Sequence, residues 1–256
     1  MHTTYSTTQA TCTIYNGDAI ETMQSLPDAS IELILADTPY QTTQCKWDTL
    51  LDLDKMFKEL NRITTKDSVI ILTASQPYTS LLITKNIKHF KYNLVWQKEQ
   101  GTNFLLAKKQ PLKVHEDIVI FAKGKNIYYP QMREGKPYVS GKGDSGEVTG
   151  KVTKTQTRNK GTRYPISILP FKRETGLHPT QKPVALMEYL IKTYSKEGDK
   201  VLDFAMGSGS TLIAALRCNR DSIGIELDRD TCNIARERVI KEIDNSCTID
   251  KKDKYE

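Results

Sequence analysis

The sequence lacks the long apolar runs, the signal peptide and the cysteine pattern of membrane or exported proteins. No apolar run exceeds five residues, far short of the ~20 that a membrane-spanning helix needs. The first ten residues have neither the basic start nor the apolar centre of a signal peptide. The five cysteines are odd in number and form no Cys-x-x-Cys pair, which disfavours a disulfide framework and a zinc site. We therefore expect a soluble, cytoplasmic protein without a bound metal.

The chain also lacks the two common glycine-rich phosphate loops. Leu212 stands where a G-x-G-x-x-G fingerprint needs its third glycine, and no Gly-Lys-Ser/Thr is present. Residues 201–216 nevertheless have the strand, glycine turn and helix of a cofactor loop, with Gly207 and Gly209 in the turn. Glu226 ends a strand about 20 residues further on, where a carboxylate can accept both ribose hydroxyls of a nucleoside. A generic turn followed by a surface Glu is the less favoured interpretation.

Acidic residues are scarce in one segment. The 256 residues include 37 Lys or Arg and 31 Asp or Glu, a formal net charge of +6. Residues 123–173 contain twelve basic and only three acidic residues, a net charge of +9, so the rest of the chain carries −3. Four tyrosines are interleaved with these charges. The pattern suggests a polyanion-binding surface for phosphate, although a solvated lysine-rich loop explains the charge equally well.

Outside this segment, strand-like and helix-like stretches alternate. Apolar patterning predicts strands at 11–15, 31–36, 68–74, 92–98, 116–122, 200–204 and 222–226. It predicts helices at 18–26, 52–63, 76–85, 183–194 and 229–243, and another that ends at residue 217. This alternation indicates an α/β fold, a mainly parallel, doubly wound sheet with helices on both faces.

The predicted strand 31–36 runs directly into Asp37-Thr38-Pro39-Tyr40. An Asp at the carboxyl end of a buried strand lies where open α/β sheets bind ligands. A carboxylate, carbonyl acceptors and an aromatic ring suit a planar ring that bears an amino group. Taken alone, Asp-x-Pro-Tyr is also an ordinary turn.

Together these pieces resemble the DNA amino-methyltransferases that use S-adenosylmethionine. Residues 37–40 resemble that family's Asp-Pro-Pro-Tyr catalytic motif, and residues 203–210 resemble its Asp-Pro-Phe-x-Gly-Ser-Gly-Thr cofactor motif. His-Pro-Thr-Gln-Lys-Pro at 178–183 matches a third signature outright, and it is the most specific of the three. A looser pattern is Trp96-Gln97-Lys98 followed by His115-Glu116. The resemblance spans residues 11–240.

The order of these motifs is typical of the family's β group, because the catalytic turn precedes the glycine loop. It implies a Rossmann-like methyltransferase fold with circularly permuted motif order, in which strand 11–15 lies beside strand 222–226. The expected organisation is one catalytic and cofactor-binding domain formed by 11–122 and 174–245. A basic target-recognition insert would occupy 123–173, and 1–10 and 246–256 would be tails.

The resemblance implies methyl transfer from S-adenosylmethionine to the exocyclic N6 of a flipped adenine in DNA. The implied catalytic residues are Asp37, Thr38, Pro39 and Tyr40. The implied cofactor-binding residues are Asp18, Asp37, His178, Thr180, Lys182, Asp203, Phe204, Gly207, Ser208, Gly209, Ser210 and Glu226. The expected DNA-binding residues are Lys142, Lys151, Lys154, Arg158, Lys160 and Arg163. Trp47 and Asn103 are weaker candidates for contact with the base.

Several alternatives stay open. N4 of cytosine is an amine that the same pocket can serve. A catalytically weak DNA-binding relative is another alternative, because Thr38 replaces the first proline of the motif and makes the turn less rigid. RNA or protein amide methylation is disfavoured by the motif order and the basic insert. The family suggests a bacterial or phage-encoded restriction-modification enzyme, and leaves open a homodimer and a cognate restriction endonuclease.

Overall fold

The chain forms two compact units in the computed structural model, which describes residues 2–38, 51–140, 156–174, 176 and 181–252, the side chains of 246–252 excepted. The larger unit comprises residues 1–129 and 167–256, and the smaller comprises residues 130–166. The smaller unit is narrower than the predicted insert of 123–173. One reason is that residues 168–170 hydrogen bond to the main sheet of the larger unit.

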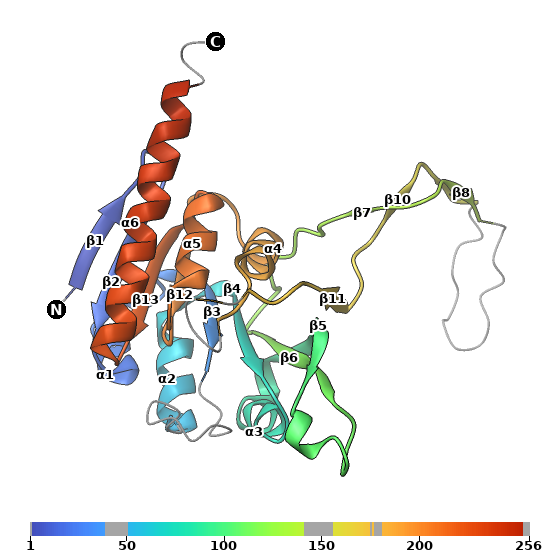
Figure 1. Ribbon diagram of the computed structural model, residues 1–256, viewed down its shortest axis with the longest axis horizontal. Coiled ribbons are helices and arrows are strands. Elements are labelled where there is room, and N and C mark those ends of the chain that lie inside the picture. The colour runs from blue at the N-terminus through green and yellow to red at the C-terminus, as the bar shows by residue number, and fades with distance from the viewer. Residues whose placement is uncertain (1, 39–50, 141–155, 175, 177–180, 253–256) are drawn as a thin grey trace. The chain divides into compact units, whose positions relative to one another are not determined.

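The larger unit is built on a sheet of nine described strands in the order β1–β2–β13–β12–β3–β4–β6–β5–β11 (Figure 1). In that order the strands are His2–Ser6, Thr11–Asn16, Asp221–Glu226, Lys200–Asp203, Ile31–Asp37, Thr64–Ala74, Lys113–Ala122, Phe90–Thr102 and Ile168–Pro170. Neighbours from β2 to β4 are parallel, whereas β1 and β6 run antiparallel to the strands beside them. The predicted mainly parallel sheet is confirmed, and so is the adjacency of strand 11–15 with the strand that ends at Glu226.

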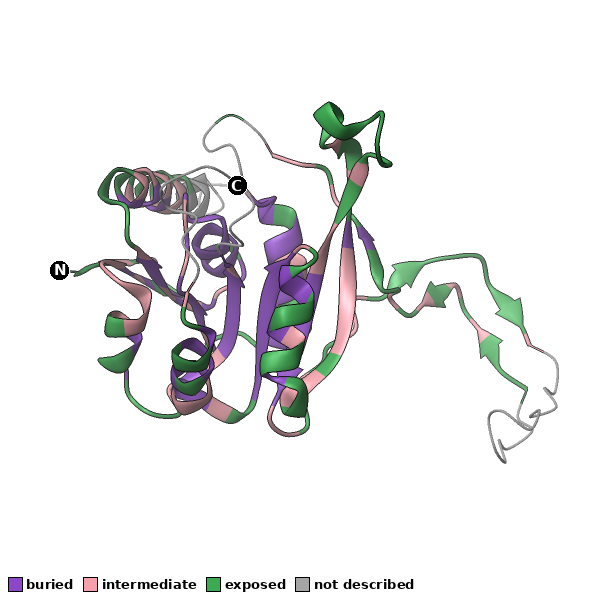
Figure 2. Cartoon of the chain, turned by 90° about the horizontal axis from the view of Figure 1, so that it is seen from below, coloured by how far each residue is buried: buried purple, intermediate pink, exposed green. Residues whose placement is uncertain are grey.

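Helices cover both faces of this sheet and enclose two hydrophobic cores. On one face, α4 (Val184–Tyr194), α5 (Ser210–Arg217) and α6 (Arg229–Lys252) pack over a cluster that includes Leu33 and Leu35. On the other, α1 (Ala19–Gln24), α2 (Leu53–Ile63) and α3 (Tyr78–Lys85) pack over a cluster that includes Ile34 and Ala36. Adjacent β3 residues thus serve opposite cores, which is why this strand has a continuous apolar sequence. Figure 2 shows the central strands as buried.

Helix starts follow local sequence signals. Asp18 and Asp52 are the N-caps of α1 and α2, and their carboxylates accept hydrogen bonds from backbone N–H groups of the first turn. The helix predicted at 183–194 is α4, which begins one residue later, with Pro183 as its N-cap. The first N–H group of α4 is bonded by another residue, because the Glu174 carboxylate accepts from Val184 N at 2.8 Å. A distant side chain therefore caps this helix.

Several segments differ from the sequence prediction, and β4 and β6, for example, begin at Thr64 and Lys113 instead of residues 68 and 116. Residues 2–6, expected in a tail, form β1, which pairs with β2 at the sheet edge. Strand β5 extends to Thr102 instead of residue 98, because its polar end pairs with β6 in a hairpin. Helix α6 continues to Lys252, beyond the predicted end at 243 and into the expected C-terminal tail.

The smaller unit contains two short antiparallel ribbons. Strand β7 (Arg133–Glu134) pairs with β10 (Thr162–Arg163), and β8 (Tyr138–Val139) pairs with β9 (Arg158–Asn159). The Arg163 guanidinium lies 4.5 Å from the centre of the Tyr138 ring and donates to Asn159 Oδ1 at 2.6 Å. One of the basic side chains of this segment thus contacts one of its tyrosine rings within this unit.

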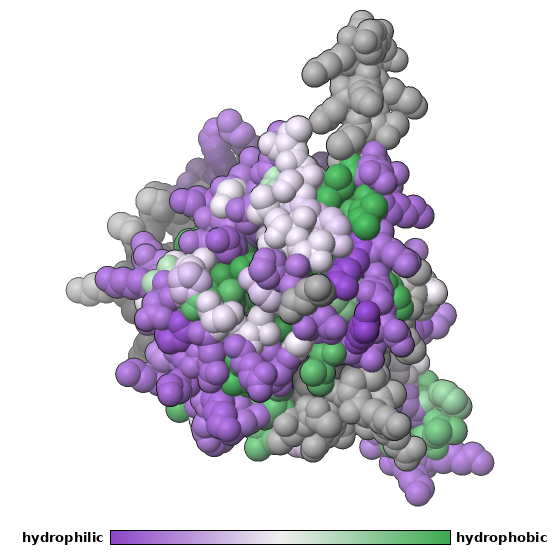
Figure 3. Space-filling model, turned by 90° about the vertical axis from the view of Figure 1, so that its left-hand side faces the viewer, coloured by the Kyte–Doolittle hydropathy of each residue, from purple (hydrophilic) through white to green (hydrophobic). Residues whose placement is uncertain are grey.

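The described surface shown in Figure 3 is mostly hydrophilic, and its hydrophobic residues are in small separate patches. Among the described helices, none combines the length and the apolar composition needed to cross a membrane.

Candidate functional site

A pocket of about 1410 Å³ lies at the carboxyl ends of the central parallel strands. Its lining includes Asp37 at the end of β3, Asp203 at the end of β12, Glu226 at the end of β13 and Asp18 after β2. Four carboxylates from four neighbouring strands therefore meet at one edge of the sheet, as expected where an open α/β sheet binds its ligand. The volume exceeds that of a typical site for one small molecule, so two ligand groups can be held together.

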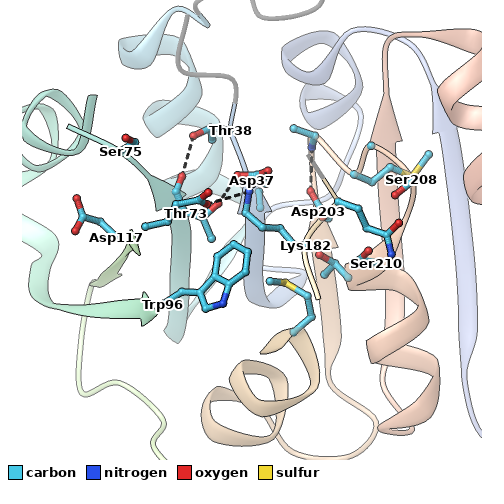
Figure 4. Close-up of a pocket in the computed structure, with 18 of the residues that line it drawn as sticks. Asp37, Thr38, Thr73, Ser75, Trp96, Asp117, Lys182, Asp203, Ser208 and Ser210 are labelled. Carbon is cyan, nitrogen blue, oxygen red and sulfur yellow. Dashed lines mark hydrogen bonds and ion pairs between the residues drawn. The ribbon is translucent and has the colours of Figure 1, made fainter. Parts of the chain in front are cut away.

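Asp37 is fixed from two sides by hydrogen bonds to its carboxylate (Figure 4). The Thr73 hydroxyl at the end of β4 donates to Oδ1, and the Lys182 ammonium lies 2.5 Å from Oδ2. The side chain remains 28% exposed, so the carboxylate is held in place and still open to the pocket. The next residue, Thr38, is buried, and its hydroxyl donates to the Thr73 carbonyl at a long 3.5 Å. Thr38 thus connects the turn to β4 through a side chain that proline does not have.

Lys182 belongs to a row of alternating buried charges. Its ammonium lies 3.2 Å from Glu116 Oε2, and Glu116 Oε1 lies 2.5 Å from the Lys98 ammonium. The three side chains are only 9–15% exposed. Burial by itself raises the pKa of Glu116, but the two ammonium groups outweigh it and the pKa is lowered. Glu116 is therefore an ionised carboxylate that compensates two buried cations beside Asp37.

The glycine turn between β12 and α5 is held by backbone contacts and by α6. Gly209, with φ of 82°, starts α5 in the left-handed region that favours glycine. The Arg238 guanidinium on α6 donates to the Ser208 carbonyl at 2.6 Å and to the Ser208 and Ser210 hydroxyls at 3.1 and 3.3 Å. Arg238 is thus a positioning residue for this turn, and both predicted serines line the pocket while bonded to it.

Asp203 is a buried acid of the pocket, and Glu226 beside it is half-buried. Complete burial is the main cause that raises the pKa of Asp203, to about 7, although hydrogen bonds from Thr211 and Ala205 oppose it. Burial likewise raises the pKa of Glu226. Each Glu226 oxygen already accepts one backbone N–H, from Gly207 at 3.0 Å and from Asp228 at 2.8 Å. Each oxygen has a second lone pair for a ligand hydroxyl.

The predicted site residues are only partly gathered in this pocket. Asp18, Asp37, Thr38, Lys182, Asp203, Phe204, Gly207, Ser208, Ser210 and Glu226 line it, and so does the weaker candidate Asn103. The Phe204 side chain is 1% exposed and packs in the hydrophobic core, so only its backbone is available to a ligand. Gly209 shapes the turn. Pro39, Tyr40, Trp47, Lys142, Lys151, Lys154, His178 and Thr180 lie outside the described residues.

The predicted DNA-binding residues that the structure describes, Arg158, Lys160 and Arg163, belong to the smaller unit. Arg163 is engaged within that unit by the contacts to Tyr138 and Asn159. Arg158 is exposed on β9, and Lys160 is exposed in the turn that follows it.

The sequence patterns did not identify three residues that hold parts of the site in place, namely Thr73, Glu116 and Arg238. Glu116 lies in the loose motif 115–116, which hinted at a function without assigning one. Thr73 and Arg238 lie in ordinary strand and helix sequences, and only the fold brings them to Asp37 and to the glycine turn.

The pocket fits a cationic nucleoside ligand. Asp and Glu residues outnumber Lys and Arg residues in its described lining. The Glu226 carboxylate can accept hydrogen bonds from ligand hydroxyls, and open space lies where a Cβ at residue 207 would be. The N-terminal N–H groups of α5 supply partial positive charge for a carboxylate group. Among the described residues, no group of three or more His, Cys, Asp or Glu side chains is arranged to hold a metal ion.

Comparison with known proteins gives a consistent result. A family model described as DNA methylase, covering the N6 and N4 enzymes, matches residues 31–237. The DNA adenine methyltransferase YhdJ of Escherichia coli strain K12 is 27% identical over 89% of this chain and 82% of its own length. Among solved structures, the M1.HpyAVI–SAM complex has a TM-score of 0.60 at 22% identity, over 89% of this chain and 99% of that one. The cytosine-N4-specific PvuII DNA methyltransferase has a TM-score of 0.65 at 16% identity, covering 94% and 93% of the two chains. The structural likenesses support the predicted Rossmann-like fold.

Proposed function

This chain belongs to the DNA methylase family of N6-adenine and N4-cytosine methyltransferases, and we propose that it methylates N6 of adenine in DNA. The observation that carries the proposal is the position of the Asp37 carboxylate, held by Thr73 and Lys182 and open to a pocket that also contains the glycine turn. S-adenosylmethionine is the methyl donor of this family. When bound, it supplies an electrophilic methyl group on a sulfonium centre.

The residues of this chain hold the two reactants. Glu226 accepts the ribose hydroxyls of the cofactor, Asp18 accepts from its adenine amino group, and Asp203 faces its cationic part. Lys182 and the glycine turn hold its carboxylate. This assignment is supported by the carboxylates that line the described pocket and by the motif resemblance.

Asp37 acts on the substrate amine. The lone pair of an exocyclic amine is delocalised into the ring, so the nitrogen is a weak nucleophile. The Asp37 carboxylate and the Thr38 carbonyl accept hydrogen bonds from its two N–H groups and stabilise the positive charge that develops on nitrogen before one proton is lost. Proximity of the two bound groups supplies much of the remaining rate. Pro39 and Tyr40 complete the turn in this proposal, with Tyr40 stacking on the flipped base.

Adenine is favoured over cytosine by the sequence similarity to a named DNA adenine methyltransferase along most of the chain. Nucleoside analysis of DNA from cells that express this chain tests the choice. We expect N6-methyladenine. N4-methylcytosine would instead assign the cytosine reaction to the same pocket, and an unmodified genome would support the catalytically weak relative.

Cofactor binding should strengthen as pH rises from 6 to 8. The pKa of Asp203, raised to about 7, makes this group largely neutral at pH 6 and largely ionised at pH 8. Only the ionised form attracts the cationic cofactor, so its Kd should fall by several-fold over this range. Calorimetric titration at several pH values measures the trend. D203N should bind more weakly with a much flatter pH profile, and an equally steep profile in D203N would contradict the assignment.

We also propose that the basic segment 123–173 recognises the DNA target. Its density of positive charge supports this role. The smaller unit alone contains eight basic and three acidic residues. A domain organisation with one catalytic domain and one recognition insert follows from this proposal. This proposal does not include binding to a cognate restriction endonuclease or to a second copy of the chain.

Neutralising Lys151, Lys154, Arg158 and Lys160 should weaken DNA binding and flatten its dependence on salt. Each phosphate contact that is lost reduces the slope of log K against log salt by about 0.9. Binding measured between 50 and 200 mM salt provides the slope. The matched control neutralises the exposed Lys55, Lys58, Lys88 and Lys91 of the larger unit. An unchanged slope in the test variant would mean that the segment is a solvated loop.

A further inference from the structure

The hairpin that joins β5 to β6 ends in an apolar tip, formed by residues 103–112. Phe104 is 76% exposed and Leu105 is 85% exposed, the most exposed of the large hydrophobic side chains described in this chain. Leu106 and Leu112 beside them are 40% and 45% exposed. Figure 2 shows the hairpin end as exposed, in contrast to the buried centre of the sheet. Such a concentration of exposed apolar surface indicates a contact with a partner.

The backbone of the tip is ordered by its own hydrogen bonds. Leu106 N donates to the Asn103 carbonyl at 2.9 Å, and Ala107 N donates to the Phe104 carbonyl at 3.1 Å, which forms a short 3-10 turn (η2, Phe104–Leu106). Lys109 N then donates to the Leu106 carbonyl at 2.8 Å and closes the next turn. Below it, the Thr102 hydroxyl donates to the Lys113 carbonyl at 3.0 Å across the hairpin. Phe104 and Leu105 are thus presented on a defined turn.

The tip also borders the candidate site. Asn103, Leu106, Gln110 and Leu112 line the same pocket as Asp37 and Glu226. A base that enters the pocket therefore comes close to this hairpin. All of these residues belong to the larger unit.

The charges around the tip match a polyanion. Residues 100–115 contain Lys108, Lys109 and Lys113 and no Asp or Glu. Lysines suit phosphate groups, and exposed aromatic and aliphatic side chains suit the faces of bases. A second protein chain is the alternative partner for the tip, and binding it would not require this excess of positive charge.

We propose that the hairpin tip binds DNA beside the target base, and that Phe104 and Leu105 enter the base stack as the target base leaves it. The proposal rests on the proposed function, because it assumes a base that is flipped into the pocket. The inserted side chains offset part of the stacking that flipping removes, which amounts to a few kcal/mol for a paired base. A base that is already mispaired needs less of this help.

The test compares F104A/L105A with the wild-type chain on two DNA duplexes. Both carry the sequence found methylated in DNA from expressing cells, and in one of them the target base is mispaired. In single-turnover methylation, we expect the variant to be slower by about tenfold or more on the paired duplex and within about threefold of wild type on the mispaired duplex. The control L81A/I87A removes two apolar side chains that are 49% and 63% exposed on α3 and in the following turn, and it should retain wild-type rates on both duplexes.

An undiminished rate of the variant on the paired duplex would overturn the proposal, and so would an equal loss of rate on both duplexes. A change in oligomeric state of the variant, measured by sedimentation, would also overturn it. That result would make the tip an interface between two copies of this chain. Cofactor affinity measured by calorimetry should be unchanged in the variant. A wild-type chain that methylates no duplex contradicts the proposed function itself, whereas an active wild type with an unaffected variant contradicts only the role of the tip.

Discussion

Replacing Asp37 with Ala should lower the rate of methyl transfer by about 10³-fold while the protein stays folded. The carboxylate is the charged acceptor that the proposal places against the substrate amine, and loss of one such preorganised group typically costs 10²–10³ in rate. The fold should survive because Lys182, which pairs with Asp37 at 2.5 Å, keeps its second carboxylate partner, Glu116, at 3.2 Å. Lys182 and Lys98 then share the one remaining carboxylate of Glu116.

Single-turnover methylation with saturating cofactor and DNA measures this effect. D37N separates charge from shape, because it keeps the size of the side chain and removes the negative charge, and it should also be severely impaired. The matched control is D54N, which makes the same chemical change at a 76% exposed carboxylate on α2. Near-normal turnover in D37A, with a normal unfolding temperature, would refute the catalytic role of Asp37.

The largest effect on stability is expected from Glu116→Gln. Glu116 pairs with Lys98 at 2.5 Å, and Lys98 is only 11% exposed, so the variant leaves a nearly buried cation without this carboxylate. Breaking a buried pair from one side typically costs about 3 kcal/mol. For a chain of this length, that lowers Tm by roughly 6–12 °C. E116Q/K98M, which removes both charges, should recover part of the loss.

The stability difference between wild type and E116Q should depend on pH. The pKa of Glu116 is lowered in the folded protein, because the Lys182 and Lys98 charges outweigh its burial. Its contribution is therefore complete above the unfolded pKa, about 4.3, and is lost as pH falls through the lowered folded value. Denaturant unfolding at pH 7 and at successively lower pH measures the difference. E237Q, at an exposed position of α6, should show little effect at any pH, and an E116Q difference that does not shrink in acid would contradict the ion-pair explanation.

The central strands could be predicted because their sequence pattern and their environment agree. Residues 31–37 are apolar throughout except at Glu32 and Asp37, and the structure buries this strand between two helical layers. Strand β1 could not be predicted in the same way. Its residues His2–Ser6 are mostly exposed and polar, and it is a strand because its backbone pairs with the edge of β2.

The candidate site also has features that the local sequence predicts and features that depend on the tertiary structure. The sequence by itself determined the motifs, their order and hence the permuted α/β fold, because strand ends, glycine turns and N-caps are local signals. It placed Asp37, Asp203 and Glu226 at the ends of strands, and the sheet order then brings them to one edge.

Only the tertiary structure decided which side chains hold these residues in place. Lys182 reaches Asp37 across 145 positions of the chain, and Arg238 reaches Ser210 from a different helix. The strength of such contacts depends on burial and on distance in space, and neither can be deduced from the local sequence. The same holds for Asp203, whose carboxyl is ordinary in sequence and acquires a pKa of about 7 because the packed sheet and α5 exclude water from it.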